Sequence, residues 1–422
     1  MTETRKNIVV LGGSYGGISA AHNILKHTIP HLPNKESYQV VIISAASQVM
    51  CRPGCPRALI SDDLLDQSRF FVNIPEQFEQ YPKDNFRFIQ GTATELDHQS
   101  RTVTYRTVVG GGDQATEKIP FYALVIATGA STPSPLFSFN TDEKALRASW
   151  ETFRKALPTA RTIVIAGGGP TGVEVAGELG EYLNGRPGLF SSKLAKPKVA
   201  ITVVTSASRI LPGVLRDSLA EKAEGMLARV GVTVVKSIRV KSVSPESSGT
   251  EAAALATKTT VTLEDGEALE ADIYIPAFGM RYNTGFVAKD LLTPEGRVET
   301  NSSTLRVDKA GPRIYAVGDV SSAARPAVHS ILGQIPVLSA NLKRDLLIDA
   351  GVQNKTSPGG EDRVFKEDKR ETQMVPIGQS KGVGAFAGWA FPSFLVWLIK
   401  GRDYWLWTTG NLWSGKQWIK EG

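Results

Sequence analysis

A glycine-rich turn between a Val/Ile-rich strand and a helix limits the folds open to this chain. The sequence RTIVIAGGGPTGVEVAGEL occupies residues 161–179, with the spacing G-x-G-x-x-G at Gly167, Gly169 and Gly172. In such a turn the first glycine permits the bend, the second lets a pyrophosphate approach the backbone, and the third lets helix and strand pack closely. Free N–H groups at the helix N-terminus favour the phosphates. The segment predicts a dinucleotide-binding unit; the alternative is a glycine-rich turn without a ligand.

A second turn of this kind stands near the N-terminus. The sequence NIVVLGGSYGGISAAHNIL (residues 7–25) again leads from a strand into a helix and keeps Gly12 and Gly17, with Ser14 at the middle position. Serine adds only a hydroxymethyl group, which a slightly displaced phosphate can accommodate. Two such turns in one chain predict two nucleotide-binding units.

Further strands of the same type alternate with helices along the chain, which favours parallel sheets. They are expected within residues 38–44, 122–131, 198–206, 271–279 and 313–319. A chain of 422 residues is also too long for one ordinary core. The predicted fold class is α/β, with two Rossmann-like dinucleotide-binding domains plus a small C-terminal segment.

The acidic residue that commonly binds the adenosine ribose is missing from both units. Ser44 ends the second strand of the first unit, and Thr205 and Ser206 end that of the second, with Arg209 shortly after. A neutral strand end followed by arginine removes the repulsion of a 2′-phosphate and can attract it. This slightly favours NADPH over NADH. The alternative is that Arg209 caps a loop or pairs with an acid.

Four elements stand in one order: the turn at residues 12–17, LVIATG (124–129), the turn at 167–172, and IYAVGD (314–319). This order resembles the two-dinucleotide-binding-domain flavoproteins. GGGPTGVEVAGEL and the C-terminal IKGRDYW resemble the apoptosis-inducing-factor-like branch, which includes the ferroptosis suppressor protein and is related to type II NADH dehydrogenases. The resemblance implies FAD bound by residues 1–148 and 279–350, NAD(P)H bound by residues 149–278, and a C-terminal segment at 351–422.

The resemblance also implies cofactor-binding residues. On the FAD side these are Gly12, Gly13, Ser14, Gly16, Gly17, Ser44, Arg57, Ala93, Thr128, Gly129, Gly318 and Asp319. On the nicotinamide side they are Gly167, Gly169, Pro170, Gly172, Thr205, Arg209 and Gly279.

The implied chemistry is hydride transfer from nicotinamide C4 to flavin N5, for which the protein supplies stacking and exclusion of water. Two side chains are candidate catalytic residues by resemblance. Glu174 would orient the nicotinamide or help move protons; the alternative is that it only complements the helix dipole. Lys400 would stabilise a reduced anionic flavin or a quinone oxyanion; the alternative is a solvated lysine at a helix end.

Cys51 and Cys55 lie close together after the second strand, in MCRPGCPR. Disulfide reductases of the same superfamily carry a redox pair near this point, although with a different interval. The alternative is two small apolar residues in the flavin pocket. His22, His27 and His31 do not predict a metal site, because Pro30 interrupts the helix that carries them.

The C-terminal segment is rich in tryptophan: six of the seven tryptophans lie in the last 34 residues. Phe391, Phe394, Leu395 and Leu398 have the spacing of one helical face. This helix is apolar on its other side too, so it must be buried or immersed. Aromatic and basic residues together suit a membrane interface. We expect residues 388–407 to form an apolar mouth beside the flavin, with peripheral membrane contact; the alternative is packing over the flavin or in a homodimer.

Other observations narrow the classes of function. A net charge of +6 without a recognition motif argues against nucleic acid. No run approaches 18 apolar residues, and the N-terminus has no recognisable targeting signal, so a cytoplasmic protein is expected. The predicted function is an FAD-dependent NAD(P)H oxidoreductase that reduces a lipophilic, quinone-like acceptor. Two alternatives remain: a soluble flavoprotein acting on a biosynthetic intermediate or a disulfide, and a redox-gated signalling protein with slow turnover.

Overall fold

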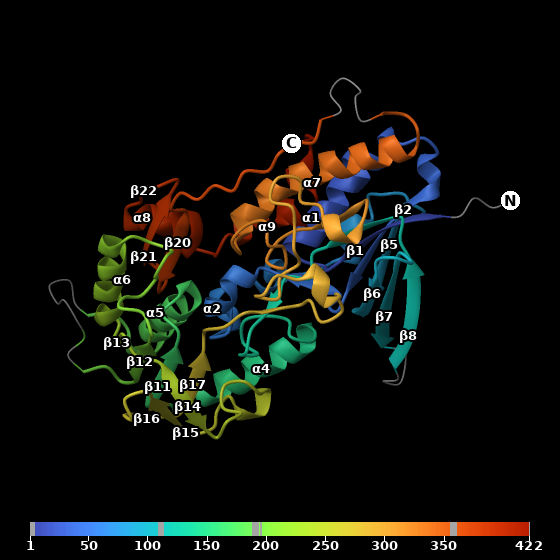
Figure 1. Cartoon of the computed structure of the whole chain (residues 1–422). Helices are drawn as coiled ribbons and strands as arrows, with labels where there is room; N and C mark the ends of the chain where they lie inside the picture. Colours follow the sequence, from blue (N-terminus) through green and yellow to red (C-terminus); the bar gives the residue numbers. More distant parts are fainter. Residues whose placement is uncertain (1–4, 109–113, 188–193, 195, 355–360, 422) are drawn as a thin grey trace.

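The computed structural model describes residues 5–108, 114–187, 194, 196–354 and 361–421. Its first sheet has five parallel strands in the order β19-β9-β1-β2-β5 (Figure 1). Helices α1 and α7 cover one face, and the antiparallel sheet β6-β7-β8 packs on the other. The central strands are largely apolar, as expected for strands that are covered on both faces. Bounds are β1 Lys6–Leu11, β2 Tyr38–Ser44, β5 Phe86–Gln90, β6 Thr92–Asp97, β7 Thr102–Val108, β8 Gln114–Pro120, β9 Ala123–Ile126, β19 Ile314–Ala316, α1 Tyr15–Asn23 and α7 Val328–Asp349.

The second sheet repeats this plan with four parallel strands in the order β13-β12-β11-β17. Helices α4, α5 and α6 share a core with one face, and the antiparallel sheet β14-β15-β16 packs on the other. The predicted α/β fold class is confirmed. Bounds are β11 Thr162–Ala166, β12 Ala200–Val204, β13 Val232–Val235, β14 Val240–Ser244, β15 Thr259–Leu263, β16 Ala268–Ala271, β17 Ile273–Pro276, α4 Glu143–Ala156, α5 Pro170–Asn184 and α6 Asp217–Arg229.

Two short antiparallel strands, β10 and β18, join the halves where the chain leaves the first sheet and where it returns to it. Asn283 fixes this crossing: its amide donates to Thr128 O at 2.9 Å and accepts from Ser131 Oγ at 2.7 Å. The predicted boundaries near residues 148, 278 and 350 remain predictions. Bounds are β3 Gln48–Met50, β4 Phe71–Asn73, β10 Ala130–Ser131, β18 Arg281–Tyr282, α2 Cys55–Ala58 and α3 Gln67–Phe70.

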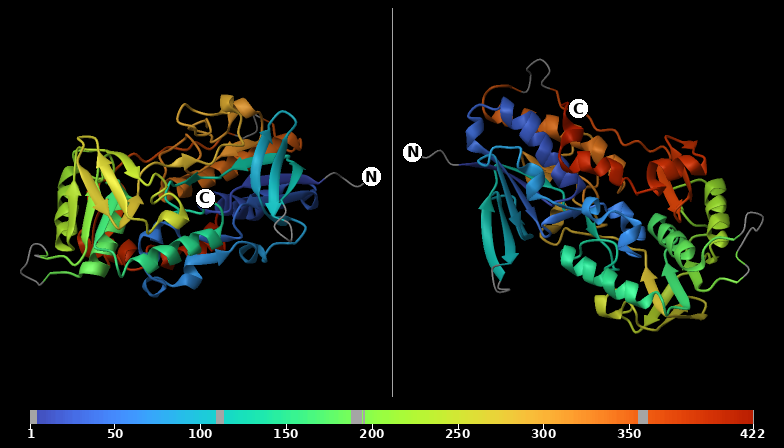
Figure 2. Two further views of the ribbon diagram at one scale, coloured as in Figure 1. Left: turned by 90° about the horizontal axis from the view of Figure 1, so that it is seen from below. Right: turned by 180° about the vertical axis from the view of Figure 1, so that it is seen from behind.

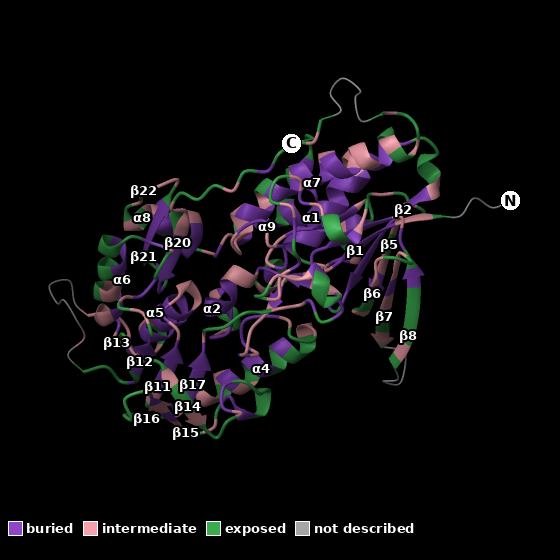
Figure 3. Ribbon diagram, in the orientation of Figure 1, coloured by how far each residue is buried: buried purple, intermediate pink, exposed green. Residues whose placement is uncertain are grey.

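The C-terminal segment touches both halves (Figure 2). Its sheet β20-β21-β22 packs on α5 and α6, while α9 packs on α1. Gly177 permits this contact, because a Cβ there would lie 2.8 Å from Ile377 Cα. Burial is continuous from α5 into β20 and β21 (Figure 3). Bounds are β20 Gln373–Ile377, β21 Lys381–Phe386, β22 Trp389–Ala390, α8 Ser393–Val396, the π-helix Trp397–Gly401 and α9 Leu406–Trp413.

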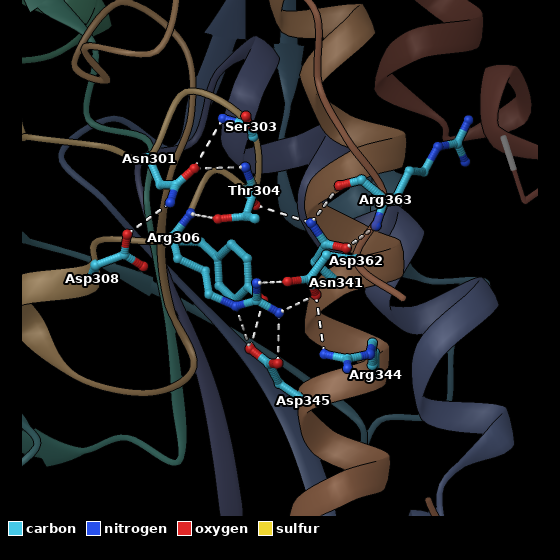
Figure 4. A network of polar contacts seen from close by, with 11 residues as sticks. Asn301, Ser303, Thr304, Arg306, Asp308, Asn341, Arg344, Asp345, Asp362 and Arg363 are labelled. Carbon is cyan, nitrogen blue, oxygen red and sulfur yellow. Dashed lines mark hydrogen bonds and ion pairs between the residues drawn. The ribbon is translucent and has the colours of Figure 1, made fainter. Parts of the chain in front are cut away.

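A network of charged and polar side chains holds the start of this segment on the first half of the molecule. Arg306 donates to both carboxylate oxygens of Asp345 on α7 and of Asp362, and Arg344 reaches Asp362 at 3.1 Å (Figure 4). Asn341 donates to Arg363 O at 2.9 Å. Residues 361–363 are therefore held on the surface of the first half. No helix within the described residues is long and apolar enough to cross a bilayer.

Candidate active site

The first glycine turn leaves its backbone open. Gly12 has a φ of +112°, and a Cβ there would lie 2.3 Å from Ala127 O. A Cβ at Gly17 would lie 1.8 Å from Gly12 O, so glycine is required where α1 crosses the turn. Ser14 is the exposed N-cap of α1 and its side chain makes no cap hydrogen bond. The turn therefore offers free N–H groups and a hydroxyl for phosphate.

The second turn has the same geometry. Gly167 has a φ of +128°, and a Cβ at Gly172 would lie 1.9 Å from Gly167 O. Gly169 caps α5 with open space beside its Cα, and Pro170 is the first helical residue. Proline suits this position because its missing N–H would have no partner within the helix. Both turns therefore fit a dinucleotide pyrophosphate.

The residues that replace the ribose-binding acids lie against the turns. A Cβ at Gly13 would lie 2.6 Å from Ser44 Oγ, and one at Gly168 would lie 2.8 Å from Thr205 Oγ1. The loop after Thr205 also bends over its turn, since Leu211 N donates to Gly168 O at 2.7 Å. Ser44 and Thr205 therefore lie beside the glycine turns, and their contact with a ribose remains a prediction.

Arg209 lies in this loop but is already engaged. Its guanidinium meets Asp217 Oδ1 at 2.8 Å and donates to Leu215 O at 2.7 Å. The Asp217 side chain is 80% exposed, so this pair is open to solvent and to a competing phosphate. The alternative raised from the sequence, pairing with an acid, is the arrangement in the structure; binding of a 2′-phosphate remains a prediction.

Asp319 follows β19 beside the crossing of the two halves. Arg52 NH1 stands 3.9 Å from Asp319 Oδ2 and donates to Ala130 O at 2.9 Å. Burial raises the pKa of Asp319, while Arg52 and Arg297 oppose the shift. Arg52 was not among the predicted cofactor residues. Its signal in the sequence was only a basic residue directly after β3, which many loops share.

Other predicted FAD-side residues lie at the carboxyl edge of the same sheet. Ala93 follows β5 through Gly91, whose N–H donates to Ser44 O at 2.8 Å. Thr128 Oγ1 donates to Asn283 O at 2.7 Å. Two further predicted FAD-side residues, Gly129 and Gly318, have positive φ angles of +65° and +80°; on the nicotinamide side, Gly279 has a φ of +72°. Contacts of these residues with a cofactor remain predictions.

A buried ion pair joins α5 to the C-terminal segment. Lys400 Nζ donates to Glu174 Oε1 at 2.5 Å and to Met374 O at 2.9 Å, and its ammonium lies 4.9 Å from the Trp405 ring centroid. Lys400 is 3% exposed and Glu174 is 4% exposed. The alternative of a solvated lysine is therefore wrong. Burial raises the pKa of Glu174 to about 7, although Lys400 pulls it down.

Arg57, which the resemblance predicts to contact FAD, forms a second buried ion pair. Its guanidinium donates to Glu178 Oε1 and Oε2 at 2.7 and 3.0 Å, and only 2% of the residue is exposed. Glu178 lies one helical turn after Glu174, on the same face of α5. Sequence reasoning did not connect Glu178 with Arg57, and a flavin contact by Arg57 remains a prediction.

The two cysteines are free thiols and fully buried. Cys51 Sγ donates to Tyr404 O at 3.2 Å, and Tyr15 donates to Cys51 Sγ at 3.6 Å. Burial raises the pKa of Cys51 to about 11 and raises that of Cys55 further. A thiolate is the reactive form, so this environment favours the packing interpretation over a redox pair.

The histidines near α1 hold the end of the chain. His22 Nε2 contacts Trp413 O at 2.7 Å and His27 Nε2 contacts Trp418 O at 2.8 Å. Burial lowers the pKa of His22 to about 4, so it is neutral at physiological pH. Within the described part of the chain no group of three or more His, Cys, Asp or Glu side chains is arranged to hold a metal.

The terminal tryptophans divide into two groups. Trp413 and Trp418 are buried on the first half, with exposed fractions of 0% and 6%. The apolar helical face that the sequence predicts in this segment forms only in part, because the residues that point inward here are Val396 and Lys400. A second group of large apolar residues remains exposed on the C-terminal segment and is called the aromatic surface below. Its members are Phe386, Trp389, Phe394, Trp397, Leu398 and Trp407.

Two glycine turns on two sheets, with hydroxyl and carboxylate groups at their carboxyl edges, define a two-nucleotide oxidoreductase fold. Residues 6–337 match the family described as pyridine nucleotide-disulphide oxidoreductase, and the chain belongs to this family. The expected FAD and NAD(P)H cofactors are thereby confirmed, and the chain is an FAD-dependent NAD(P)H oxidoreductase.

Three relatives illustrate the match. Oxidoreductase phnG of Penicillium herquei is 62% identical over 417 residues, which are 99% of this chain and 98% of that protein. Human ferroptosis suppressor protein 1 is 24% identical over 405 residues, covering 94% and 93% of the two chains. The solved sulfide:quinone oxidoreductase of Aquifex aeolicus has a TM-score of 0.67 at 17% identity, covering 96% and 92%. The expected resemblance to the ferroptosis suppressor branch is confirmed.

Asp319→Ala is expected to weaken flavin binding by about 10- to 100-fold, and so to lower the flavin content of the purified protein, because a hydrogen bond to a charged group contributes about 1.5–3 kcal/mol. The flavin-to-protein absorbance ratio measures this. Asp290→Ala is the control, since Asp290 is exposed and lies in the short 3-10 helix Lys289–Leu291, outside both glycine turns. Equal flavin content in the two variants would contradict a flavin contact by Asp319.

Proposed function

We propose that this oxidoreductase passes electrons from NAD(P)H through FAD to a lipophilic, quinone-like acceptor. The observation that carries the proposal is the buried Glu174–Lys400 pair, which joins the nicotinamide-side helix α5 to the segment that bears the aromatic surface. Burying an ammonium and a carboxylate costs several kcal/mol of desolvation per ion. A C-terminal segment that served only to pack on the core would not need this pair.

The chemistry of quinone reduction explains such a pair. When bound, the nicotinamide supplies a hydride to the flavin, and a quinone then takes up a hydride equivalent and one proton. A carboxylate at Glu174 stabilises the positive charge that develops on a neighbouring nicotinamide. Because its pKa lies near 7, Glu174 can also hold the proton that the acceptor needs. Lys400 supplies positive charge for a quinone oxygen.

The aromatic surface supports a lipophilic acceptor. Trp389 is 78% exposed and Phe394 is 63% exposed, on elements that directly precede Lys400. Trp407 Nε1 donates to Ile399 O at 3.1 Å, which holds α9 beside the π-helix. Exposed apolar groups of this kind mark interaction sites. In this proposal they contact the membrane interface and admit the acceptor; the cellular location follows as cytoplasmic and peripheral.

The experiment is anaerobic reduction of the flavin by NADH or NADPH, followed by a screen of acceptors that reoxidise it. Long-chain quinones presented in vesicles, a short soluble quinone and a disulfide are compared at equal concentration. Reoxidation is expected to be fastest with the vesicle-borne quinone. Reoxidation by the disulfide alone would overturn the proposal and favour a thiol-linked oxidoreductase.

The nucleotide preference gives a separate prediction. The wild type is expected to use NADPH at least as well as NADH, and Ser206→Glu should lower the NADPH:NADH ratio of kcat/KM by about 10-fold through repulsion of the 2′-phosphate. Ser206 is the suitable position because it is exposed, whereas Thr205 packs against Gly168. Asp217→Asn, which removes the carboxylate partner of Arg209, is the opposite change and should raise the same ratio. A wild type strongly selective for NADH would contradict this.

A further inference from the structure

A second buried cluster lies one helical turn beyond the proposed catalytic pair. Arg57 binds both carboxylate oxygens of Glu178, and the Tyr404 hydroxyl donates to Glu178 Oε1 at 2.9 Å. The guanidinium also lies 4.8 Å from the Tyr404 ring centroid. All three residues are at most 2% exposed. Every oxygen and nitrogen named here is therefore committed to a partner inside the protein.

This cluster joins three parts of the chain. Arg57 comes from α2, Glu178 from α5 and Tyr404 from the C-terminal segment. Arg57 also donates to Arg402 O at 3.1 Å and to Gly378 O at 3.3 Å, both in the C-terminal segment. One guanidinium therefore fixes the first half, the nicotinamide-side helix and the tail relative to one another.

The tail adopts an unusual backbone to reach this cluster. Tyr404 and Trp405 have φ angles of +53° and +70°, a region that residues with side chains rarely occupy. Tyr404 N donates to Lys400 O at 2.6 Å, so the Tyr404 turn is bonded directly to the residue that carries the proposed catalytic ammonium. A residue in such a backbone conformation must be held by its surroundings, and Tyr404 is held by its contacts with Glu178 and Arg57.

We propose that the Arg57–Glu178–Tyr404 cluster is a positioning site that holds Lys400 against Glu174 and so couples the C-terminal segment to hydride transfer. The proposal rests on the function proposed above for Glu174 and Lys400. These three residues act through the pair and need no contact with substrate. The cluster also explains how a tail that joins both halves presents its lysine in one fixed place.

The cluster acts on Glu174 through charge as well as position. The charged groups that face Glu174 are Lys400 from the π-helix, Glu178 from α5 itself and Arg57 from α2; Tyr404 is the other titratable neighbour. Burial and the charge of Glu178 raise the pKa of Glu174, whereas Lys400 and Arg57 lower it. Removing the Glu178 charge therefore lowers the pKa of Glu174. The charge of Arg57, which then has no counter-charge on Glu178, lowers this pKa further.

The test is the rate of flavin reduction by NAD(P)H, measured by anaerobic stopped flow between about pH 5 and 9. In Glu178→Gln the inflection of the pH profile is expected at a lower pH than in wild type. Tyr404→Phe removes one hydrogen bond at constant ring packing and should slow reduction roughly 3- to 10-fold. Tyr182→Phe, an exposed tyrosine on the same helix, is the matched control and should match wild type.

Glu174→Gln separates this inference from the function on which it rests. If Glu174→Gln flattens the profile while Glu178→Gln and Tyr404→Phe match wild type, the positioning role is wrong and the function stands. If Glu174→Gln keeps the wild-type profile, the proposed role of Glu174 is itself wrong. If Glu178→Gln does not fold, Tyr404→Phe alone decides, because a rate equal to that of Tyr182→Phe overturns the positioning role.

Discussion

Glu174→Gln is expected to reduce a short soluble quinone at least 100-fold more slowly than wild type. The glutamine keeps the shape of the side chain but cannot hold or release a proton, and a positioned acid or base contributes about 10²–10⁴-fold. The measurement is steady-state turnover with saturating NAD(P)H, together with the flavin content, which should stay unchanged because Glu174 contacts Lys400 and lies beyond the glycine turn.

The raised pKa of Glu174 also predicts the direction in which the free energy of unfolding changes with pH. The pKa of Glu174 is raised from 4.5 to about 7 in the folded protein. Its contribution to stability is therefore full below about pH 4.5 and is lost as pH rises through 7. The free energy of unfolding of wild type, relative to Glu174→Gln, should fall over that window by an amount on the order of 3 kcal/mol. Chemical denaturation at several pH values measures this.

A double variant controls for the damage done by one unpaired charge. Lys400→Met alone leaves a carboxylate without its cation, a change that typically costs about 3–5 kcal/mol when a buried pair is broken. Glu174→Gln with Lys400→Met removes both charges and should recover much of that stability while remaining inactive. Normal quinone turnover in the stable double variant would contradict a catalytic role for the pair.

The two nucleotide-binding folds could be predicted from local sequence because their determinants are local. Glycine is needed at four positions where a backbone atom would lie within 2.5 Å of an added Cβ: Gly12, Gly17, Gly167 and Gly172. Each of these glycines directly follows, or lies close to, the strand that predicts the turn. The hydroxyl residues at the strand ends follow from the same short-range rule. Arg209 could be placed near the ribose end, but its partner Asp217 lies on a separate helix and was not identified.

The contact between the two proposed catalytic residues could not be predicted from their spacing in the sequence. Glu174 and Lys400 are 226 residues apart, and their contact depends on how the tail packs on α5. That path requires a close approach at Gly177 and positive φ angles at Tyr404 and Trp405, neither of which a sequence pattern indicates. Lys400 entered the prediction by resemblance alone. The partner of Arg57 could not be predicted either, because nothing in the local sequence CPRAL indicates the buried Glu178.

The structure also changes how the tail can be tested. Val375, Ile377, Val383 and Ala385 are buried in the core shared with α5, so removal of the whole segment would expose that core. Lys400 is buried and cannot serve as a surface charge for anionic lipid. The useful changes are therefore substitutions on the aromatic surface.

Trp389→Ser combined with Phe394→Ser is expected to lower turnover with a vesicle-borne long-chain quinone by more than 10-fold, while turnover with a short soluble quinone stays within about twofold. Full burial of one large apolar side chain is worth about 1.5–3 kcal/mol, so loss of even part of two such contacts exceeds the 1.4 kcal/mol that corresponds to 10-fold. Binding to vesicles in co-sedimentation should fall in parallel.

Val352→Ser is the matched control, because Val352 is 57% exposed but lies after α7 and outside the aromatic surface. It should leave vesicle binding and both turnovers unchanged. Arg402→Gln addresses charge separately: Arg402 lies over the Trp407 ring at 5.4 Å, and its loss should make binding to anionic vesicles less sensitive to salt. If wild type ignores vesicles and the double variant loses both turnovers equally, the aromatic surface serves the fold or a subunit contact, and the acceptor reaches the flavin by another route.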